Sequence, residues 1–263
     1  MILSCQSICK SFGEKVILQD ASFHIEEREK AALIGNNGAG KTTTFYMIVG
    51  IEKPDAGTVM LDGKDISALP EHKRAPYLGR VFQDPMTGTV ADMEIIENLA
   101  IAARRGKKRG LSWGVKADER IRYRQMLAEF DLGLEDRMSS KVGLLSGGQR
   151  QAITLLMATI KKPKLLLLDE HTAALDPKTA AKVLELSDKI IAENNLTALM
   201  VTHNMHDAIT HGNRLIMMSD GKIILDISGE EKKNLTVEHL LEMFEKASGS
   251  KLENDRMLLS KDK

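Results

Sequence analysis

A glycine-rich loop placed directly after an apolar run is the strongest constraint on the fold of this chain. Residues 30–34 predict a buried strand, and residues 35–42 read Gly-Asn-Asn-Gly-Ala-Gly-Lys-Thr, which fits the pattern G-x-x-x-x-G-K-[ST]. A helix is expected to begin near Lys41. Strand, loop and helix in this order are typical of an α/β fold, in which helices cover a parallel sheet.

Further apolar runs predict the other strands. Four of them are expected to be buried, and they lie at 80–83, 165–168, 197–201 and 214–218. The N-terminal part carries shorter and more alternating segments, at 2–8, 16–18, 21–26 and 58–61. These segments predict a small antiparallel sheet beside the α/β core.

The pattern becomes helical in the middle of the chain. Residues 92–103 and 116–130 predict helices, and we place a helical subdomain at about 85–150. This subdomain is inserted in a main domain that we expect to span residues 1–229.

The C-terminal part is predicted from its turn and cap residues. Residues 214–227 predict a hairpin, because Ser219-Asp220-Gly221 supplies a turn between two apolar runs. In the last segment, residues 230–263, Thr236 is expected to cap a helix that runs to Lys246, and a polar tail follows.

Charge and hydropathy exclude several classes of protein. Lysine plus arginine equals aspartate plus glutamate, 37 each, so no basic field favours nucleic acid as a partner. No apolar run approaches the roughly 18 residues of a membrane helix, and residues 1–10 lack the pattern of a secretion signal. We therefore expect a soluble, cytoplasmic protein.

The two cysteines are interpreted as core residues. Cys5 and Cys9 occupy alternate positions of the first predicted strand, which puts both on one face. Their backbones are then about 13 Å apart, beyond the roughly 7 Å limit for a disulfide. This spacing favours reduced thiols in a reducing compartment.

The glycine-rich loop predicts a binding site for a nucleoside triphosphate. Glycines at 35, 38 and 40 let backbone N–H groups approach phosphates at the positive end of the following helix. Lys41 is expected to bridge the β- and γ-phosphates, and Thr42 to bind Mg²⁺ through its hydroxyl. A plain Gly/Asn turn is the alternative.

Two carboxylates follow the run of leucines at 165–168. Asp169 and Glu170 are expected at the carboxyl edge of the sheet, where α/β folds place their ligands. There Asp169 would hold Mg²⁺, and Glu170 would orient the attacking water or accept its proton. The alternative is the acidic start of a helix.

A second glycine motif, Leu-Ser-Gly-Gly-Gln-Arg-Gln at 145–151, has two interpretations. Ser146 and Gln149 form a capping box at the start of a helix. Capping does not explain Gly147 and Gly148, because glycine is unfavourable in a first helical turn. Close approach of a phosphate to the backbone N–H groups explains them.

Together these motifs resemble the nucleotide-binding subunits of ABC transporters. The resemblance implies a P-loop NTPase (RecA-like) α/β core with an antiparallel β subdomain and an inserted helical subdomain. It also implies two Mg-ATP molecules sandwiched between two head-to-tail subunits, with Ser146 and Gly148 acting on the nucleotide of the partner. The cofactors are then ATP and Mg²⁺.

The resemblance extends to four further positions and assigns roles. Gln83 matches the glutamine loop, Asp176 the loop that crosses the dimer interface, His203 the switch histidine and Phe12 the aromatic that stacks on adenine. The expected catalytic residues are Lys41, Gln83, Glu170 and His203, and the expected Mg²⁺ ligands are Thr42, Gln83 and Asp169. The residues expected to bind nucleotide are Phe12, Gly35, Asn36, Asn37, Gly38, Ala39, Gly40, Lys41, Thr42, Thr43, Ser146, Gly147, Gly148, Gln149 and Asp176.

Two positions depart from the family pattern. His171 stands where the family commonly has proline, and Phe12 replaces a commoner tyrosine. Neither change removes a catalytic group. His203, His206, Asp207 and His211 could also be read as a zinc cluster, but the change from strand to helix at 201–205 would scatter these side chains.

A basic run lies in the predicted helical region. Residues 104–109 carry five cations, with Arg120, Arg122 and Arg124 beyond them, and we interpret them as a solvated face. Contact with anionic lipid or with an acidic patch on a membrane subunit is the alternative. Trp113 is expected to anchor a loop against the subdomain.

The resemblance implies an ATPase subunit that drives separate permeases from the cytoplasmic face of the membrane. Its expected partners are a second ATPase subunit in a homodimer, transmembrane permeases and a substrate-binding protein. Residues 104–114 and 169–177 resemble importer ATPases, some of them linked to aromatic amino-acid uptake. The alternatives are a soluble clamp-like ABC ATPase, an exporter ATPase, and a P-loop kinase or GTPase, which accounts poorly for residues 146–149.

Overall fold

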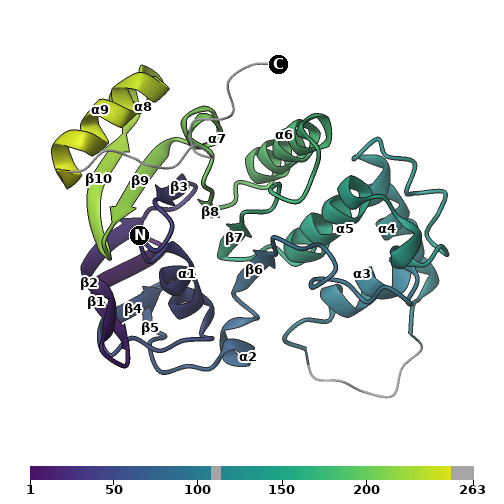
Figure 1. Ribbon diagram of the computed structural model, residues 1–263. Coiled ribbons are helices and arrows are strands. Elements are labelled where there is room, and N and C mark those ends of the chain that lie inside the picture. Colours follow the sequence, from purple (N-terminus) through teal and green to yellow (C-terminus); the bar gives the residue numbers. More distant parts are fainter. Residues whose placement is uncertain (108–113, 250–263) are drawn as a thin grey trace. The chain divides into compact units, whose positions relative to one another are not determined.

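The computed structural model describes residues 1–107 and 114–249 (Figure 1). These residues form two compact units. The first comprises Met1–Arg74 with the described residues from Asn195 onward, and the second comprises the described residues of Ala75–Asn194.

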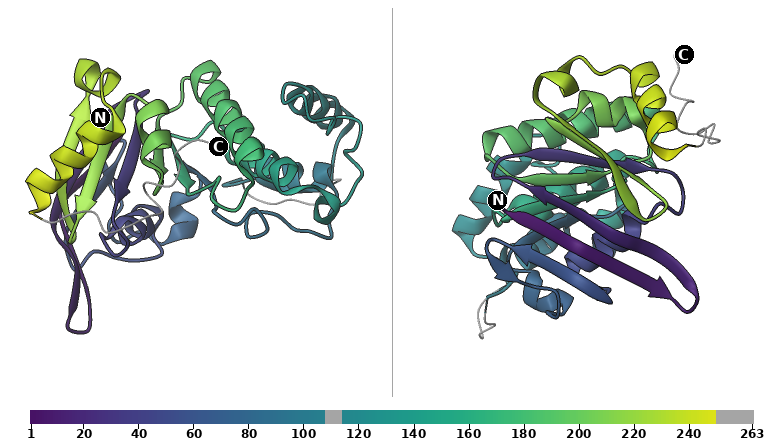
Figure 2. Two further views of the ribbon diagram at one scale, coloured as in Figure 1. Left: turned by 45° about the horizontal axis from the view of Figure 1, so that its top comes forward. Right: turned by 90° about the vertical axis from the view of Figure 1, so that its left-hand side faces the viewer.

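The first unit contains the expected antiparallel sheet, whose long strands are seen edge to edge in Figure 2. Its strands, in the order β2-β1-β4-β5, are Lys15–Ile25, Leu3–Phe12, Ala56–Leu61 and Lys64–Asp65. The prediction of separate strands at 16–18 and 21–26 was wrong, because β2 runs through both. Asp20 adopts a positive φ of 54°, and the register with β1 shifts between Lys10 and Ile8, so the pairing continues across the interruption.

The first unit also contains parallel strands that carry the glycine-rich loop. Strand β3 (Lys30–Gly35) is buried along its whole length and pairs in parallel with β8 (Ala198–Val201) on one side and β9 (Arg214–Ser219) on the other. Strand β9 forms the predicted hairpin with β10 (Lys222–Ser228). The helices of this unit are α1 (Lys41–Val49), α2 (Glu71–Arg74), α7 (Met205–Thr210), α8 (Gly229–Lys233) and α9 (Val237–Ser248).

Helix α9 begins as predicted. The hydroxyl of Thr236 accepts a hydrogen bond from the backbone N–H of His239 at 3.2 Å, and the helix continues two residues past the predicted end, to Ser248. The tail from residue 250 lies outside the described residues. No helix in the described part of the chain combines the length and apolar character that crossing a bilayer requires.

The second unit contains two parallel strands and the helices that precede and follow the second glycine motif. Strand β6 (Leu78–Val81) pairs with β7 (Leu165–Asp169). Strand β6 starts and ends two residues before its predicted range, so Gln83 follows the strand and lies in a loop. The helices are α3 (Ile95–Ala103), α4 (Ala117–Ala128), the 3₁₀ turn η1 (Val142–Leu144), α5 (Gly147–Thr159) and α6 (Pro177–Glu193).

The expectation that both cysteines share one face was wrong. Ser7 has a positive φ of 49°, and the register of β1 shifts between Cys5 and Ile8. Ile8 therefore continues the buried row of Leu3 and Cys5, and Cys9 is only half-buried. Burial raises the pKa of the Cys5 thiol to about 12. Both thiols are free.

The interpretation of the basic run as a solvated face was wrong for its first two arginines. Arg104 lies 3.0 Å from a carboxylate oxygen of Glu119 and also donates to the carbonyl of Ala100. Arg105 donates to the carbonyls of Ala158 and Lys161, at 3.2 Å each. These arginines connect α3 to α4 and α5, and Trp113 lies outside the described residues.

A buried lysine makes the stability of the first unit change with pH in the alkaline range. Lys30 is 7% exposed, and burial, with a smaller effect of the Lys232 charge, lowers its pKa to about 8. In the unfolded chain the Lys30 side chain keeps its proton up to its ordinary pKa of 10.5, whereas in the folded chain it loses the proton near pH 8. The folded state therefore gains stability as pH rises from 8 to 10.5.

We expect wild type to gain about 2 kcal/mol relative to Lys30→Met between pH 8 and pH 10. Urea unfolding of both proteins at several pH values measures this difference. A difference that stays constant over this range contradicts the prediction.

Candidate nucleotide site

The glycine-rich loop has a backbone that only glycine adopts easily. Gly35, Gly38 and Gly40 all have positive φ, of 151°, 86° and 98°. A side chain at Gly35 would collide with the carbonyl of Met218 on β9, and one at Gly40 would collide with Leu18. Gly38 faces open space, so its glycine serves the conformation of the loop and leaves its backbone accessible.

Helix α1 begins in this loop without a local cap. Its N-cap residue is Gly40, no side chain caps the helix, and its first turn contains no acidic residue. The first backbone N–H groups of a helix need acceptors, and the positive end of its dipole favours an anion. Thr42 is exposed at this end of the helix. The loop therefore fits the triphosphate of a nucleotide.

Lys41 and Asn36 add two polar groups to the loop. The Lys41 ammonium is buried and donates to the carbonyls of Gly35 at 2.6 Å and of Asn36 at 3.0 Å. The side-chain oxygen of Asn36 is buried with no hydrogen-bond partner among the described residues. The cation is thus held by backbone oxygens of the same loop that is expected to receive the phosphates.

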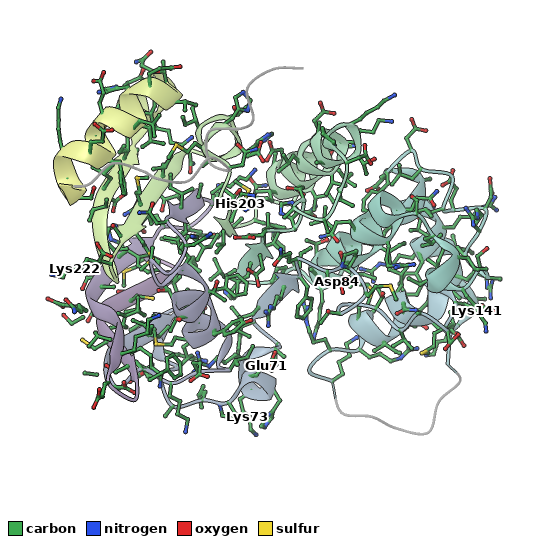
Figure 3. The ribbon with its side chains drawn as sticks, viewed as in Figure 1. Glu71, Lys73, Asp84, Lys141, His203 and Lys222 are labelled. Carbon is green, nitrogen blue, oxygen red and sulfur yellow. The ribbon has the colours of Figure 1, made fainter. Side chains whose placement is uncertain are left out.

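Two other predicted residues belong to the first unit. Phe12 ends β1 and is 49% exposed, and the Lys10 ammonium lies 5.2 Å from the centroid of its ring, so Phe12 is not a core residue. His203 follows β8 and is half-buried (Figure 3). No group of three His, Cys, Asp or Glu side chains in the described part of the chain is arranged to hold a metal ion, so the zinc interpretation finds no support there.

The second unit holds the predicted carboxylates. Asp169 ends β7 and is mostly buried, and burial raises the pKa of its carboxyl, whereas the charge of Arg80 lowers it. Glu170 follows with a positive φ of 43°, which is unusual for a residue with a side chain. His171 is buried, with its Nε2 atom 3.1 Å from the Ser187 hydroxyl on α6. This contact anchors the chain at a position where the family commonly has proline.

The second glycine motif forms the predicted capping box. The Ser146 hydroxyl accepts from the N–H of Gln149 at 3.3 Å, and the Gln149 side chain accepts from the N–H of Ser146 at 3.2 Å. A side chain at Gly148 would collide with the Thr179 methyl group on α6. Packing against Thr179 therefore explains the absence of a side chain at Gly148, and the sequence alone did not predict this contact. Ser146 and Gly147 are exposed, so the start of α5 is accessible to a ligand.

Gln83 and Asp176 occupy loops of the same unit. Gln83 is exposed in the loop after β6. Asp176 caps α6 by accepting from the N–H of Thr179 at 3.1 Å, and hydrogen bonds from the side chain and the backbone of Thr179 lower the pKa of its carboxyl.

Each unit thus gathers part of the predicted site. The first holds Phe12, residues 35–43 and His203, and the second holds Gln83, residues 146–149, Asp169, Glu170 and Asp176. Sequence reasoning missed Arg80, which lies beside Asp169. An arginine inside an apolar strand was the available signal.

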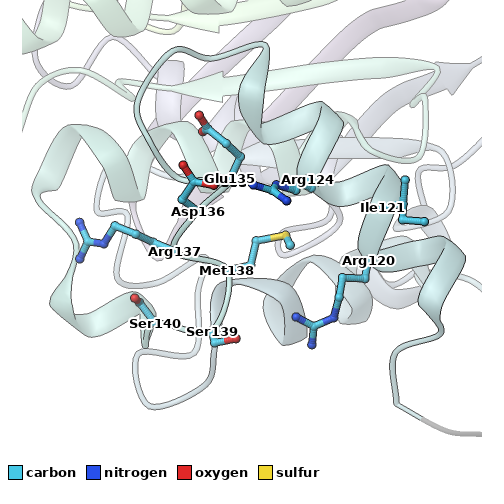
Figure 4. A pocket seen from close by; sticks show the side chains of 9 residues that line it. All are labelled: Arg120, Ile121, Arg124, Glu135, Asp136, Arg137, Met138, Ser139 and Ser140. Carbon is cyan, nitrogen blue, oxygen red and sulfur yellow. Dashed lines mark hydrogen bonds and ion pairs between the residues drawn. The ribbon is translucent and has the colours of Figure 1, made fainter.

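A cavity of about 560 Å³ lies elsewhere in the second unit, between α4 and the segment 135–140 (Figure 4). Arg124 points toward Asp136 across it, with a 2.6 Å ion pair. The lining contains Arg120, Arg124 and Arg137 and none of the predicted nucleotide-binding residues. The alternative role of these arginines, contact with lipid or an acidic membrane subunit, stays a prediction.

Comparison with known proteins supplies the decisive observation. The sequence model of the ABC transporter family matches residues 18–173, which contain the glycine-rich loop, the second glycine motif and both carboxylates. The chain belongs to the ABC transporter family.

Two relatives with known roles are similar to this ABC protein. A tyrosine transport ATP-binding protein of Clostridioides difficile is 44% identical over 251 residues, which cover 94% of this chain and 100% of that protein. The spermidine/putrescine import ATP-binding protein PotA of Haemophilus ducreyi is 35% identical over 240 residues, which cover 90% of this chain and 62% of PotA. The chain thus spans less than two thirds of the length of PotA.

Solved structures confirm the predicted fold class. An ATP-binding cassette of an ABC transporter in its ADP conformation matches with a TM-score of 0.77 and 29% identity, covering 92% of this chain and 98% of that one. A dimeric, post-hydrolysis state of another ATP-binding cassette, bound to ADP and Pi, matches with a TM-score of 0.72 and 28% identity, covering 86% and 98%. The chain has the P-loop NTPase core of these cassettes, with an antiparallel sheet and helices.

Membership of the family defines the activity. ABC ATP-binding subunits hydrolyse ATP, so this chain is an ATPase subunit of a transporter, with ATP and Mg²⁺ as cofactors. Such subunits work with permeases and pair with a second ATPase subunit.

Proposed function

We propose that this chain drives the uptake of a small solute of the amino-acid class, such as tyrosine, through separate permease subunits. The observation that carries the proposal is the match over the full length of a tyrosine transport ATP-binding protein, at 44% identity. The proposed assembly contains two copies of this chain on the cytoplasmic face of the membrane, with a substrate-binding protein on the other face.

We propose the following roles in the hydrolysis cycle. Bound Mg-ATP supplies the γ-phosphoryl group that water attacks. The loop at 35–43 holds the phosphates through backbone N–H groups and Lys41, and Phe12 stacks on the base. Glu170 takes the proton of the water, and His203 contacts the γ-phosphate.

The remaining residues complete the proposed site. Thr42, Gln83 and Asp169 are the proposed Mg²⁺ ligands, and their oxygen atoms are the type that this ion prefers. The start of α5, at Ser146–Gln149, meets the nucleotide of the partner copy, and Asp176 lies at the interface between copies.

An exposed apolar patch in the second unit supports a permease partner. Met86, Val90 and Leu144 are 45%, 49% and 72% exposed. Arg150 links the segment of Met86 to that of Leu144. Its guanidinium contacts the Met86 sulfur and donates to the carbonyl of Gly143 at 3.0 Å. The N–H of Gly143 donates to the carbonyl of Ala91, next to Val90. Grouped apolar side chains on a surface are typical of a protein interface.

The proposal is tested with cells that contain the permease, the substrate-binding protein and this chain. We expect ATP-dependent tyrosine uptake with wild type. With Leu144→Asp we expect at least a tenfold loss of uptake and of co-purification with the permease, because a charge then enters the apolar contact. Nucleotide binding by the purified variant should equal that of wild type.

Ile51→Asp is the matched control. Ile51 is 45% exposed but belongs to the first unit, so this variant should transport at the wild-type rate. Full uptake with Leu144→Asp contradicts the assignment of the patch. Absence of tyrosine uptake by the wild-type assembly contradicts the proposed substrate.

A further inference from the structure

A mostly buried arginine lies beside the carboxylate proposed to bind Mg²⁺. Arg80 and Asp169 lie 3.3 Å apart, and their side chains are 13% and 16% exposed. In the register of β6 and β7, Arg80 pairs with Leu167, two residues before Asp169. The side chain of Arg80 therefore reaches along β7 to the carboxyl end of the strand.

Neighbouring groups fix the orientation of Arg80. Its guanidinium lies 4.3 Å from the centroid of the Phe82 ring, an arrangement in which the planar cation is attracted to the ring face. The Phe82 carbonyl accepts a hydrogen bond at 3.2 Å from the side chain of Gln151, which is fully buried on α5. The arginine is thus held between Phe82, which follows β6, and the end of β7.

The local charge explains why a cation is needed here. Asp169 and Glu170 are consecutive carboxylates, and Asp169 is removed from water. Arg80 therefore supplies positive charge at the place where the proposed function puts a divalent cation.

We propose that Arg80 is the resident counter-ion of Asp169 and that Mg²⁺ must compete with it for this carboxylate. The inference rests on the proposed role of Asp169 as a Mg²⁺ ligand. Arg80 is then a positioning residue that holds the Asp169 carboxylate in place, and sets how strongly nucleotide binding depends on Mg²⁺.

The competition predicts two opposite effects when the charge is removed. Without Arg80, Mg²⁺ no longer competes with a cation for the Asp169 carboxylate, so it binds more tightly. ATP without Mg²⁺ binds more weakly, because the net charge of the site becomes more negative. A purely structural arginine would not shift these two affinities in opposite directions.

The test measures binding of a fluorescent ATP analogue to the purified full chain as Mg²⁺ is varied. For Arg80→Gln we expect the Mg²⁺ concentration at half-saturation to fall about fivefold, and the affinity without Mg²⁺ to fall about threefold. For Arg80→Lys, which keeps the charge, we expect both values within about twofold of wild type. Unchanged values in Arg80→Gln, or a higher Mg²⁺ midpoint, overturn the proposal.

Two further variants separate the possible failures. Arg124→Gln removes an arginine from an exposed ion pair of the same unit and should bind as wild type does. Asp169→Asn should raise the Mg²⁺ midpoint. If it does and Arg80→Gln changes nothing, only the role of Arg80 is wrong. If Asp169→Asn leaves the midpoint unchanged, the proposed metal ligand is wrong and the role of Arg80 is overturned with it.

Discussion

Glu170→Gln is expected to bind ATP as wild type does but to hydrolyse it at least about a hundredfold more slowly. The amide keeps the size and polarity of the side chain and loses its capacity to take a proton from the attacking water. Glu170 is well suited to a test of this role, because its backbone has an unusual positive φ of 43° directly after β7. The backbone thus directs this one side chain away from the regular strand geometry.

The slow variant should also accumulate as an ATP-dependent dimer. If two copies of the chain enclose two nucleotides, hydrolysis is the step that lets them separate, so its loss traps the pair. Phosphate release measures turnover, and size-exclusion chromatography with light scattering measures the dimer.

Glu193→Gln is the control for this prediction, because Glu193 is an exposed glutamate at the end of α6 in the same unit. It should retain full turnover and show no trapped dimer. Turnover by Glu170→Gln close to that of wild type would show that another group takes the proton.

Arg74→Met is expected to destabilise the first unit by about 3–5 kcal/mol. Arg74 is fully buried, and its guanidinium donates to the carbonyls of Met47, Ile48, Leu69 and Ser67. Met47 and Ile48 belong to the last turn of α1, where backbone carbonyls lack partners within the helix. The cation also compensates the negative end of the helix dipole.

The expected loss comes from the groups that methionine leaves behind. Methionine fills a similar volume but donates no hydrogen bond, so buried carbonyls stay unpaired. Urea unfolding of the full chain measures the change. Lys73→Met alters the neighbouring exposed residue and should change the free energy of unfolding by less than about 0.5 kcal/mol (Figure 3). A loss for Arg74→Met as small as that of Lys73→Met contradicts the prediction.

This arginine connects fold to function. Helix α1 presents its uncapped N-terminus to the proposed phosphate site, and Arg74 satisfies its C-terminus through carbonyls of Met47 and Ile48. A helix held at one end by a buried cation can leave the other end open to an anion without fraying.

Local signals in the sequence determined most elements and the loops that carry the motifs. The apolar run before Gly35, the capping box of Ser146 and Gln149, and the Thr236 cap all depend on residues within a few positions of one another. Such features can be predicted from the sequence, because the residues that form them are close together in the chain. The same holds for the glycine-rich loop, because glycine adopts a positive φ without steric cost.

Only the tertiary structure decided which groups meet across long stretches of chain. Asp169 is 89 residues from Arg80, and Arg105 is 53 residues from Ala158, so no local pattern predicts these contacts. The bulge at Ser7, which separates the faces of Cys5 and Cys9, depends on pairing with β2 and β4. The same reason applies to Gly148, whose missing side chain makes room for Thr179. Packing of elements that are distant in sequence fixes these features, because their partners come together only when the chain is folded.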